Sequence, residues 1–303
     1  MESDYDEIIA KIDKAIITHG IPHYINKWRK IDIPENFDSY DDFLNFLKEY
    51  VKAYHYHSFV KSLKQQSEYA IQSRKEHMEK EENGYLPEFK WDTKNKIGTI
   101  KFYHFYNGLD EKKNNDAINN ITNIVVTNFN DWINKDINGL IIDLREHKGG
   151  NMWAHIPSLK NILGNTTLLS FTNIQVTHKD KKWINMRDGE IFHNEEFMSR
   201  ELKFKKPIAV LVSKNTASSG EFITGIFYKR DNVRMFGDKT KETAGYFSAN
   251  CGFKITDDIV LFSTIVLCET TDGILHTDEI LHVDQKTNNP MTDAKKWIMK
   301  EIL

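Results

Sequence analysis

The sequence contains little cysteine, with Cys251 and Cys268 as the only two in 303 residues. Two cysteines in a chain of this length do not make the disulfide framework of a small secreted domain, and they fit a reducing compartment. The sequence also lacks a run rich in lysine and arginine, and its formal net charge is −3. The charge pattern therefore favours neither a nucleic acid nor an acidic membrane surface as a partner.

Long apolar runs are absent too, because none approaches the length that crosses a membrane. The first residues, Met1 to Glu7, are acidic and contain neither the basic nor the apolar stretch of a signal peptide. The sequence thus predicts a cytoplasmic protein that does not enter a membrane. Its length favours a domain of catalytic size with an appendage over a single core.

Apolar spacing divides the chain into three predicted regions. Residues 1–75 carry helical stripes, including a second helix that starts at Ser39, and predict a helical N-terminal region. Residues 76–96 are charged and then loop-like, which predicts a connector. Residues 97–303 alternate between strand-like and helix-like segments, which is typical of an α/β core with crossover helices.

One stretch of the core, residues 206–225, is a candidate nucleophile turn. A short apolar run predicts a buried strand, small polar residues predict a turn, and apolar residues at helical spacing follow. Ser218 falls at the start of that helix, where backbone N–H groups and the positive dipole end favour a developing negative charge. The alternative is structural, because Ser218 and Glu221 also form the pattern of a capping box.

A second turn, after the apolar strand that ends at Leu144, contains the pair Gly149 and Gly150. Glycines allow backbone N–H groups to approach a ligand closely, which an oxyanion hole requires. A simple turn is the alternative. Asp143 and Arg145, just before the pair, are interpreted as a structural ion pair rather than as catalytic groups.

Several motifs taken in order resemble peptidase family S41, the tail-specific or C-terminal-processing proteases. The resemblance covers about 97–285 and rests on four segments: Leu140–Trp153 with its Asp-Leu-Arg and Gly-Gly, Pro207–Glu221, Phe236–Tyr246 with Thr-Ala-Gly, and Glu279–Asp284 after Asp272-Gly273. It implies a ClpP- or crotonase-like core with a mixed sheet and crossover helices. It also implies a serine-type endopeptidase that acts on peptide or protein substrates.

The sequence departs from the family pattern at two points. The processing proteases have a catalytic lysine directly after Thr-x-Gly, whereas Tyr246 stands there in this chain. A phenol, with an ordinary pKa of about 10, is a poor base at neutral pH. The segment before residue 97 is also too short for the inserted PDZ domain of many members. Both departures resemble the branches that include the tricorn protease core and the interphotoreceptor retinoid-binding protein modules.

The resemblance to the tricorn-like branch implies the remaining site residues. His57, followed by Ser58, matches the position of the base, and Glu279 matches the carboxylate that orients it, with Glu269 and Asp278 as rivals. Ser219 joins the two glycines as an oxyanion donor, while Ser58 and Tyr246 support the site.

No cofactor and no metal are implied by this resemblance. The pair His55 and His57 could instead ligate a metal, although further ligands at a convincing spacing are missing from the sequence. His104, on the first core strand, is interpreted as structural. The predicted function is peptide-bond hydrolysis through an acyl-enzyme, and the alternative is a non-catalytic module that binds peptides or apolar ligands.

Overall fold

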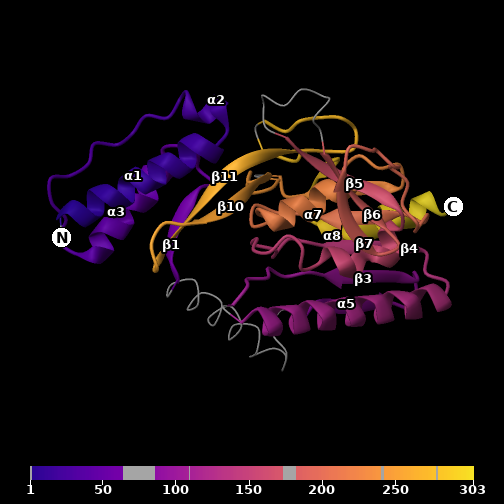
Figure 1. Ribbon diagram of the computed structural model, residues 1–303. Coiled ribbons are helices and arrows are strands. Elements are labelled where there is room, and N and C mark those ends of the chain that lie inside the picture. The colour runs from indigo at the N-terminus through magenta and orange to yellow at the C-terminus, as the bar shows by residue number, and fades with distance from the viewer. Residues whose placement is uncertain (1, 64–85, 109, 173–181, 240–241, 278) are drawn as a thin grey trace.

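The computed structural model describes residues 2–63, 86–108, 110–172, 182–239, 242–277 and 279–303. These residues form a mixed α/β core with two β-sheets and with helices at the N-terminal end (Figure 1). The predicted α/β class with a helical N-terminal region is therefore confirmed. The core strands divide between two sheets, because local periodicity does not specify which distant strands pair.

The first sheet is mostly parallel. In spatial order it contains β12 (Gln285–Lys286), β9 (Val233–Gly237), β8 (Ile208–Leu211), β4 (Gly139–Asp143), β3 (Ile97–Lys101) and β2 (Glu88–Asp92). Only the β2–β3 pair is antiparallel. Every residue of β4 and β8 is buried, as expected of parallel strands that are covered on both faces.

Helices cover both faces of this sheet. They are α5 (Glu111–Asn134), α7 (Ser219–Phe227) and α8 (Pro290–Glu301). Alternate residues of β4 point to opposite faces, so Ile142 joins Trp132 of α5 in one core cluster. Its neighbour Ile141 joins Ile298 of α8 in another.

The second sheet is antiparallel. It runs β7 (Glu190–Asn194), β6 (Lys182–Arg187), β5 (Thr166–Thr172), β11 (Ile259–Glu269) and β1 (Phe59–Ser62), and β10 (Ser248–Lys254) also pairs with β11. With 11 residues, β11 is long enough to connect two parts of the molecule. Leu261 near its start belongs to the N-terminal apolar cluster, and Cys268 near its end belongs to the main core.

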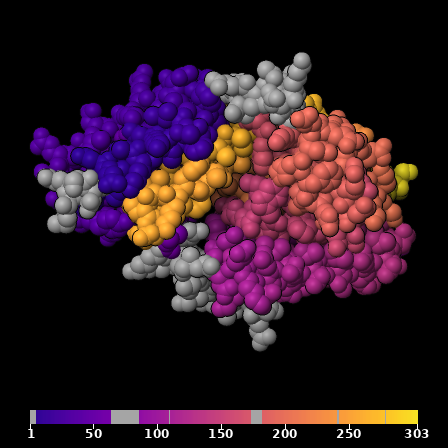
Figure 2. All heavy atoms as spheres, viewed as in Figure 1, coloured from indigo at the N-terminus to yellow at the C-terminus, as the bar shows by residue number. Residues whose placement is uncertain are grey.

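The N-terminal helices pack on the start of β11. They are α1 (Glu2–His19), α2 (Pro22–Ile25) and α3 (Tyr40–Lys52). Ser39 caps α3 by accepting a hydrogen bond from the Asp42 N–H at 3.1 Å, which confirms the predicted helix start. Figure 2 shows the orange atoms of β10 and β11 between the indigo N-terminal helices and the magenta and salmon core.

One segment of the core is less regular than its sequence indicates. The sequence of residues 152–163 favours a helix, but they form only a short 3₁₀ turn, η1 (Ile156–Leu159), and one turn of helix, α6 (Lys160–Leu163). Pro157 lacks the N–H that a helix begun at residue 152 would need there. The sequence of residues 166–176 favours a strand, which is present as β5, and residues 173–176 lie outside the described residues.

The predicted region boundaries at 75 and 96 stay predictions. Residues 76–85 of the predicted connector lie outside the described residues, and 88–92 form β2.

Candidate active site

The nucleophile candidate Ser218 lies at a sharp turn between β8 and α7. Its backbone has φ 52° and ψ −113°, a conformation that residues other than glycine rarely adopt. Such strain costs about 1–3 kcal/mol and persists only where the surrounding structure imposes it. The turn places Ser218 directly before the first helical residue, so its hydroxyl lies at the positive end of α7.

Glu221 holds this turn in place. One of its carboxylate oxygens accepts hydrogen bonds from the Ser218 N–H at 3.0 Å and the Tyr246 N–H at 2.7 Å. The other accepts from the Gly245 N–H at 2.8 Å. Burial raises the pKa of Glu221 to about 7, while the Thr243 hydroxyl and the hydrogen bonds from these N–H groups oppose that rise. The Glu221 half of the predicted capping box is therefore present, and it fixes Ser218 through the backbone.

His57 faces the hydroxyl of Ser218. Its Nε2 atom lies 3.2 Å from Ser218 Oγ, and its Nδ1 atom lies 2.7 Å from Ser248 Oγ at the start of β10. If Nδ1 carries the hydrogen and donates it to Ser248, Nε2 has the lone pair that a general base needs. Burial, and secondarily His55, lowers the pKa of His57 to about 3, so the imidazole is neutral at physiological pH.

The structure brings Glu279 to His55 rather than to His57. The Oε1 atom of Glu279 lies 2.8 Å from His55 Nε2, and both side chains are 1% exposed. Among the described residues neither atom has a partner with hydrogen-bond geometry, so the two groups are in close contact without an aligned hydrogen bond. The contact to the His57 imidazole that was predicted for Glu279 is made by Ser248.

His55 connects this carboxylate to the site through the backbone. Its Nδ1 atom accepts the His57 N–H at 3.2 Å and lies 3.0 Å from Thr264 Oγ1 on β11. Ser248 and His55 are the residues that sequence reasoning missed. The Ser248 hydroxyl belongs to a segment without a recognisable motif, so only the tertiary structure reveals it.

The predicted supporting residues differ in whether they contact Ser218 or His57. The Tyr246 ring packs beside the His57 imidazole, with ring centroids 5.0 Å apart. Ser58 is fully buried, and its hydroxyl bonds to the N–H and the side chain of Thr264 rather than to the nucleophile or the base. Glu269 ends β11, and Asp278 lies outside the described residues.

The Gly149–Gly150 turn lies against the nucleophile. A Cβ atom on Gly149 would lie 3.2 Å from Ser218 Cβ, and φ is 112° at Gly149 and 105° at Gly150. Ser219 is the first residue of α7, so its N–H has no carbonyl within the helix to bond. The glycine turn therefore lies beside Ser218, and the Ser219 N–H directly follows Ser218 along the chain.

The ion pair expected beside this turn is confirmed. Arg145 Nη2 lies 2.7 Å from Asp143 Oδ2, and Arg145 Nε donates to the other carboxylate oxygen at 2.9 Å. The two side chains stabilise the loop that leads to the glycines.

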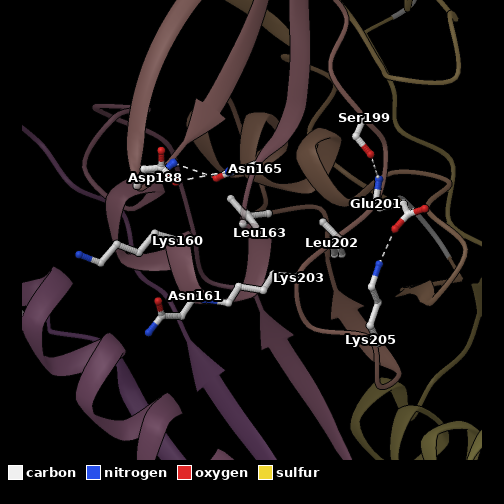
Figure 3. A pocket seen from close by; sticks show the side chains of 12 residues that line it. Lys160, Asn161, Leu163, Asn165, Asp188, Ser199, Glu201, Leu202, Lys203 and Lys205 are labelled. Carbon is white, nitrogen blue, oxygen red and sulfur yellow. Dashed lines mark hydrogen bonds and ion pairs between the residues drawn. The ribbon is translucent and has the colours of Figure 1, made fainter.

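A large hollow lies away from this cluster. It has a volume of about 770 Å³ and is lined by α6, by the turn after β6 and by residues 199–205 (Figure 3). Its Lys205 pairs with Glu201, and none of the candidate catalytic residues lines it. Among the residues that the structure describes, no three histidine, cysteine or acidic side chains gather as a metal site would require.

The comparisons with known proteins agree with the geometry. The model for peptidase family S41 matches residues 96–278, more than half of the chain, and the chain therefore belongs to this family. The predicted resemblance is confirmed. Peptide or protein substrates follow from the family.

Two individual similarities are also informative. A nisin-resistance protein from Lactococcus lactis subsp. lactis is 32% identical over 168 residues, which are 54% of this chain and 51% of that protein. The chain thus matches about half the length of this relative. A lipoprotein structure from Streptococcus agalactiae has a TM-score of 0.71 and 23% identity, and the match covers 98% of this chain and 96% of that one. This likeness shows a shared fold.

No helix among the described residues is both long and apolar enough to span a membrane. The cytoplasmic location stays a prediction from the sequence.

Proposed function

We propose that this chain is a serine peptidase that cleaves peptide bonds through an acyl-enzyme. Ser218 is the nucleophile and His57 is the general base. The observation that carries the proposal is the 3.2 Å approach of His57 Nε2 to the Ser218 hydroxyl, which lies on a strained turn at a helix N-terminus. A serine hydroxyl becomes an effective nucleophile only when such a base takes its proton.

The reaction begins when Ser218 Oγ attacks the carbonyl carbon of the scissile bond and gives its proton to His57 Nε2. The carbonyl oxygen becomes negative and accepts hydrogen bonds from backbone N–H groups of the glycine turn and of Ser219. The intermediate then collapses, and His57 returns the proton to the departing amine. A water molecule, deprotonated by His57, finally hydrolyses the ester on Ser218.

Ser248 and Glu279 serve the base in different ways. The Ser248 hydroxyl fixes the orientation of His57 and can accept a hydrogen from Nδ1, but it contributes no negative charge. Glu279 does not touch His57. Its buried carboxyl group lies against His55, and His55 Nδ1 accepts the N–H of His57. In this proposal the carboxyl group orients His55, and through it the backbone of the segment that carries His57.

Labelling and hydrolysis test the proposal together. A fluorophosphonate probe should label the wild type and not Ser218→Ala, and the substitution should lower peptide hydrolysis by at least about 10³-fold. Ser219→Ala is the matched control, because it keeps the backbone N–H and should stay active. Equal hydrolysis by the wild type and Ser218→Ala would remove Ser218 from the mechanism.

The substrate panel should combine a peptide library with nisin. The relative from Lactococcus lactis is named for nisin resistance, which motivates that choice. The alternative of a non-catalytic binding module predicts a His57 ring beyond reach of Ser218. The 3.2 Å approach supports the enzyme instead.

A further inference from the structure

Two fully buried histidines lie behind the glycine turn. His147 follows β4 and His155 precedes η1, and their ring centroids are 5.1 Å apart at an interplanar angle of 80°. Within the described part of the chain, His147 Nε2 and His155 Nδ1 have no hydrogen-bond partner. Buried polar atoms without partners are uncommon and require an explanation. The proposed reaction assigns no role to either ring.

His147 touches both turns of the site. Its carbonyl accepts the Ala217 N–H at 3.1 Å, directly before the nucleophile. Its ring Nδ1 accepts the Gly149 N–H at a long 3.4 Å. A Cβ atom on Gly220 would lie 2.6 Å from the His147 carbonyl oxygen and 2.9 Å from Nδ1, so α7 is pressed against this residue. His147 therefore sets the spacing between the glycine turn and the nucleophile turn.

The contacts of the two rings define their tautomers. His155 Nε2 lies 2.9 Å from the Tyr103 carbonyl oxygen, so it carries the hydrogen and leaves a lone pair on Nδ1. His147 Nδ1 accepts from Gly149, so its hydrogen is on Nε2. Of the two nitrogens without partners, His147 Nε2 is therefore a donor and His155 Nδ1 is an acceptor.

Both rings are neutral. Burial, and then the neighbouring His155 and His104, holds the pKa of His147 well below its ordinary value. Burial lowers the pKa of His155 to about 4, against the hydrogen bond to Tyr103. A neutral His147 ring keeps the acceptor that the Gly149 N–H requires.

The N–H that the glycine turn presents to the substrate is then that of Gly150 and not that of Gly149. Phe105 donates to the Gly149 carbonyl at 3.3 Å, and its own carbonyl accepts the Asn151 N–H at 2.7 Å. In such a parallel bridge the N–H of the middle residue, Gly150, points to the opposite side from Phe105. With the Gly149 N–H bonded to His147, the Gly150 N–H remains for a ligand.

We propose that His147 is a positioning residue of the oxyanion hole. By accepting the Gly149 N–H, it holds the Lys148–Gly149 peptide, while the Phe105 N–H holds the carbonyl of the following Gly149–Gly150 peptide. The two bonds together direct the Gly150 N–H, which belongs to that second peptide, toward the reacting carbonyl oxygen, beside the Ser219 N–H. This inference rests on the proposed peptidase function, and it narrows the donors from three candidates to Gly150 and Ser219.

Two nearly isosteric substitutions test it. His147→Asn places Oδ1 where Nδ1 lies and keeps the acceptor, whereas His147→Leu has a similar shape without one. Since losing an oxyanion donor costs about 10²–10³-fold, misdirecting one should lower kcat by about 10- to 100-fold in the leucine variant, with KM within about threefold. The asparagine variant should retain kcat within about fivefold of wild type. Equal kcat for the two variants, at similar melting temperatures, would overturn the proposal.

A spectroscopic measurement on the wild type covers the case in which a variant does not fold. Imidazole ¹⁵N spectra should show His147 as the neutral tautomer with hydrogen on Nε2 between pH 6 and 8. A charged ring, or hydrogen on Nδ1, would overturn the proposal without any reference to activity. Fluorophosphonate labelling separates the two ideas. A labelled wild type with an equally fast leucine variant refutes only the role of His147, and an unlabelled wild type refutes the peptidase function.

Discussion

At the scale of single residues, the proposed base, His57, contacts a hydroxyl. The Ser248 hydroxyl lies 2.7 Å from His57 Nδ1, and the carboxyl group of Glu279 lies against His55 instead. A hydroxyl orients an imidazole but compensates a positive charge on it poorly. Glu279 is therefore linked to His57 only through His55, whose Nδ1 accepts the His57 N–H.

Removing this hydroxyl should slow catalysis without unfolding the protein. Ser248→Ala leaves His57 Nδ1 without its partner and frees the ring to turn away from Ser218. We expect kcat/KM for peptide hydrolysis to fall by about 10-fold or more, because the orientation of the base contributes strongly in such sites. Ser248→Thr keeps a hydroxyl at this position and should recover most of the activity. Unchanged kinetics in the alanine variant would show that Ser248 does not orient the base.

At the scale of elements, the start of α7 is tied to the segment before β10. Glu221 bonds to the N–H groups of Ser218, Gly245 and Tyr246, so one carboxylate joins the nucleophile turn to the segment that carries the Tyr246 ring. These bonds explain how a strained serine backbone is maintained in the folded state.

Glu221→Gln should therefore weaken both stability and activity. The glutamine side chain has the same shape, but its amide NH₂ faces backbone donors and leaves at least one of them unpaired. A buried donor without a partner costs about 1–3 kcal/mol, so we expect a lower melting temperature together with a lower kcat. The matched control is Glu201→Gln, since Glu201 is exposed and pairs only with Lys205. Equal melting temperatures for the two variants would contradict this role of Glu221.

At the scale of the whole molecule, several buried imidazoles make folding sensitive to acid. The pKa is lowered to about 3 at His57 and about 4 at His155, and it is well below the ordinary value at His147. Below pH 6.5 these histidines bind protons in the unfolded chain but stay neutral in the folded protein. Acid therefore favours the unfolded state, so the stability present above pH 6.5 is lost as the pH falls. Glu221, with its pKa raised to about 7, binds its proton more readily in the folded protein. Its effect on the free energy of unfolding is therefore opposite, and it offsets the effect of about one histidine.

We expect the free energy of unfolding to decrease between pH 7 and pH 4. His57 and His155 each contribute a loss on the order of 3 kcal/mol, by the factor of about 1.4 kcal/mol for each pKa unit, and His147 adds to the loss in the same direction. Chemical denaturation at pH 7 and at pH 4 measures this decrease in the free energy of unfolding. His155→Phe removes one titrating ring and should make the decrease smaller. A free energy of unfolding that does not change with pH would show that the rings are not buried as neutral groups.

The elements that the sequence predicted are those with local signals. The cap at Ser39, the turn at Ser218 and the ion pair of Asp143 with Arg145 are each encoded within a few residues. The β6–β7 hairpin was missed although Asp188-Gly189, a pair typical of a two-residue hairpin turn, stands between its strands. Its strands are mixed and charged in sequence, so their alternation was not recognised.

The partners of the two histidines could not be predicted. His55 and His57 stand one residue apart, outside any helix or strand, so no period indicates which ring faces the nucleophile. The choice depends on where β1 pairs with β11 and on where β10 begins, which are contacts between distant parts of the chain. The sequence assigned Glu279 to the His57 imidazole, whereas in the structure its carboxyl group lies against His55.

The pairing of β1 with β11 has a consequence for synthesis of the protein. Ribosomes make the base first, in the segment before β1, and the nucleophile much later, between β8 and α7. Neither Ser248 at the start of β10 nor the strand that anchors the His57 segment exists until translation has passed Ser218. The proposed nucleophile and the proposed base can therefore meet only after β10 and β11 have been synthesised.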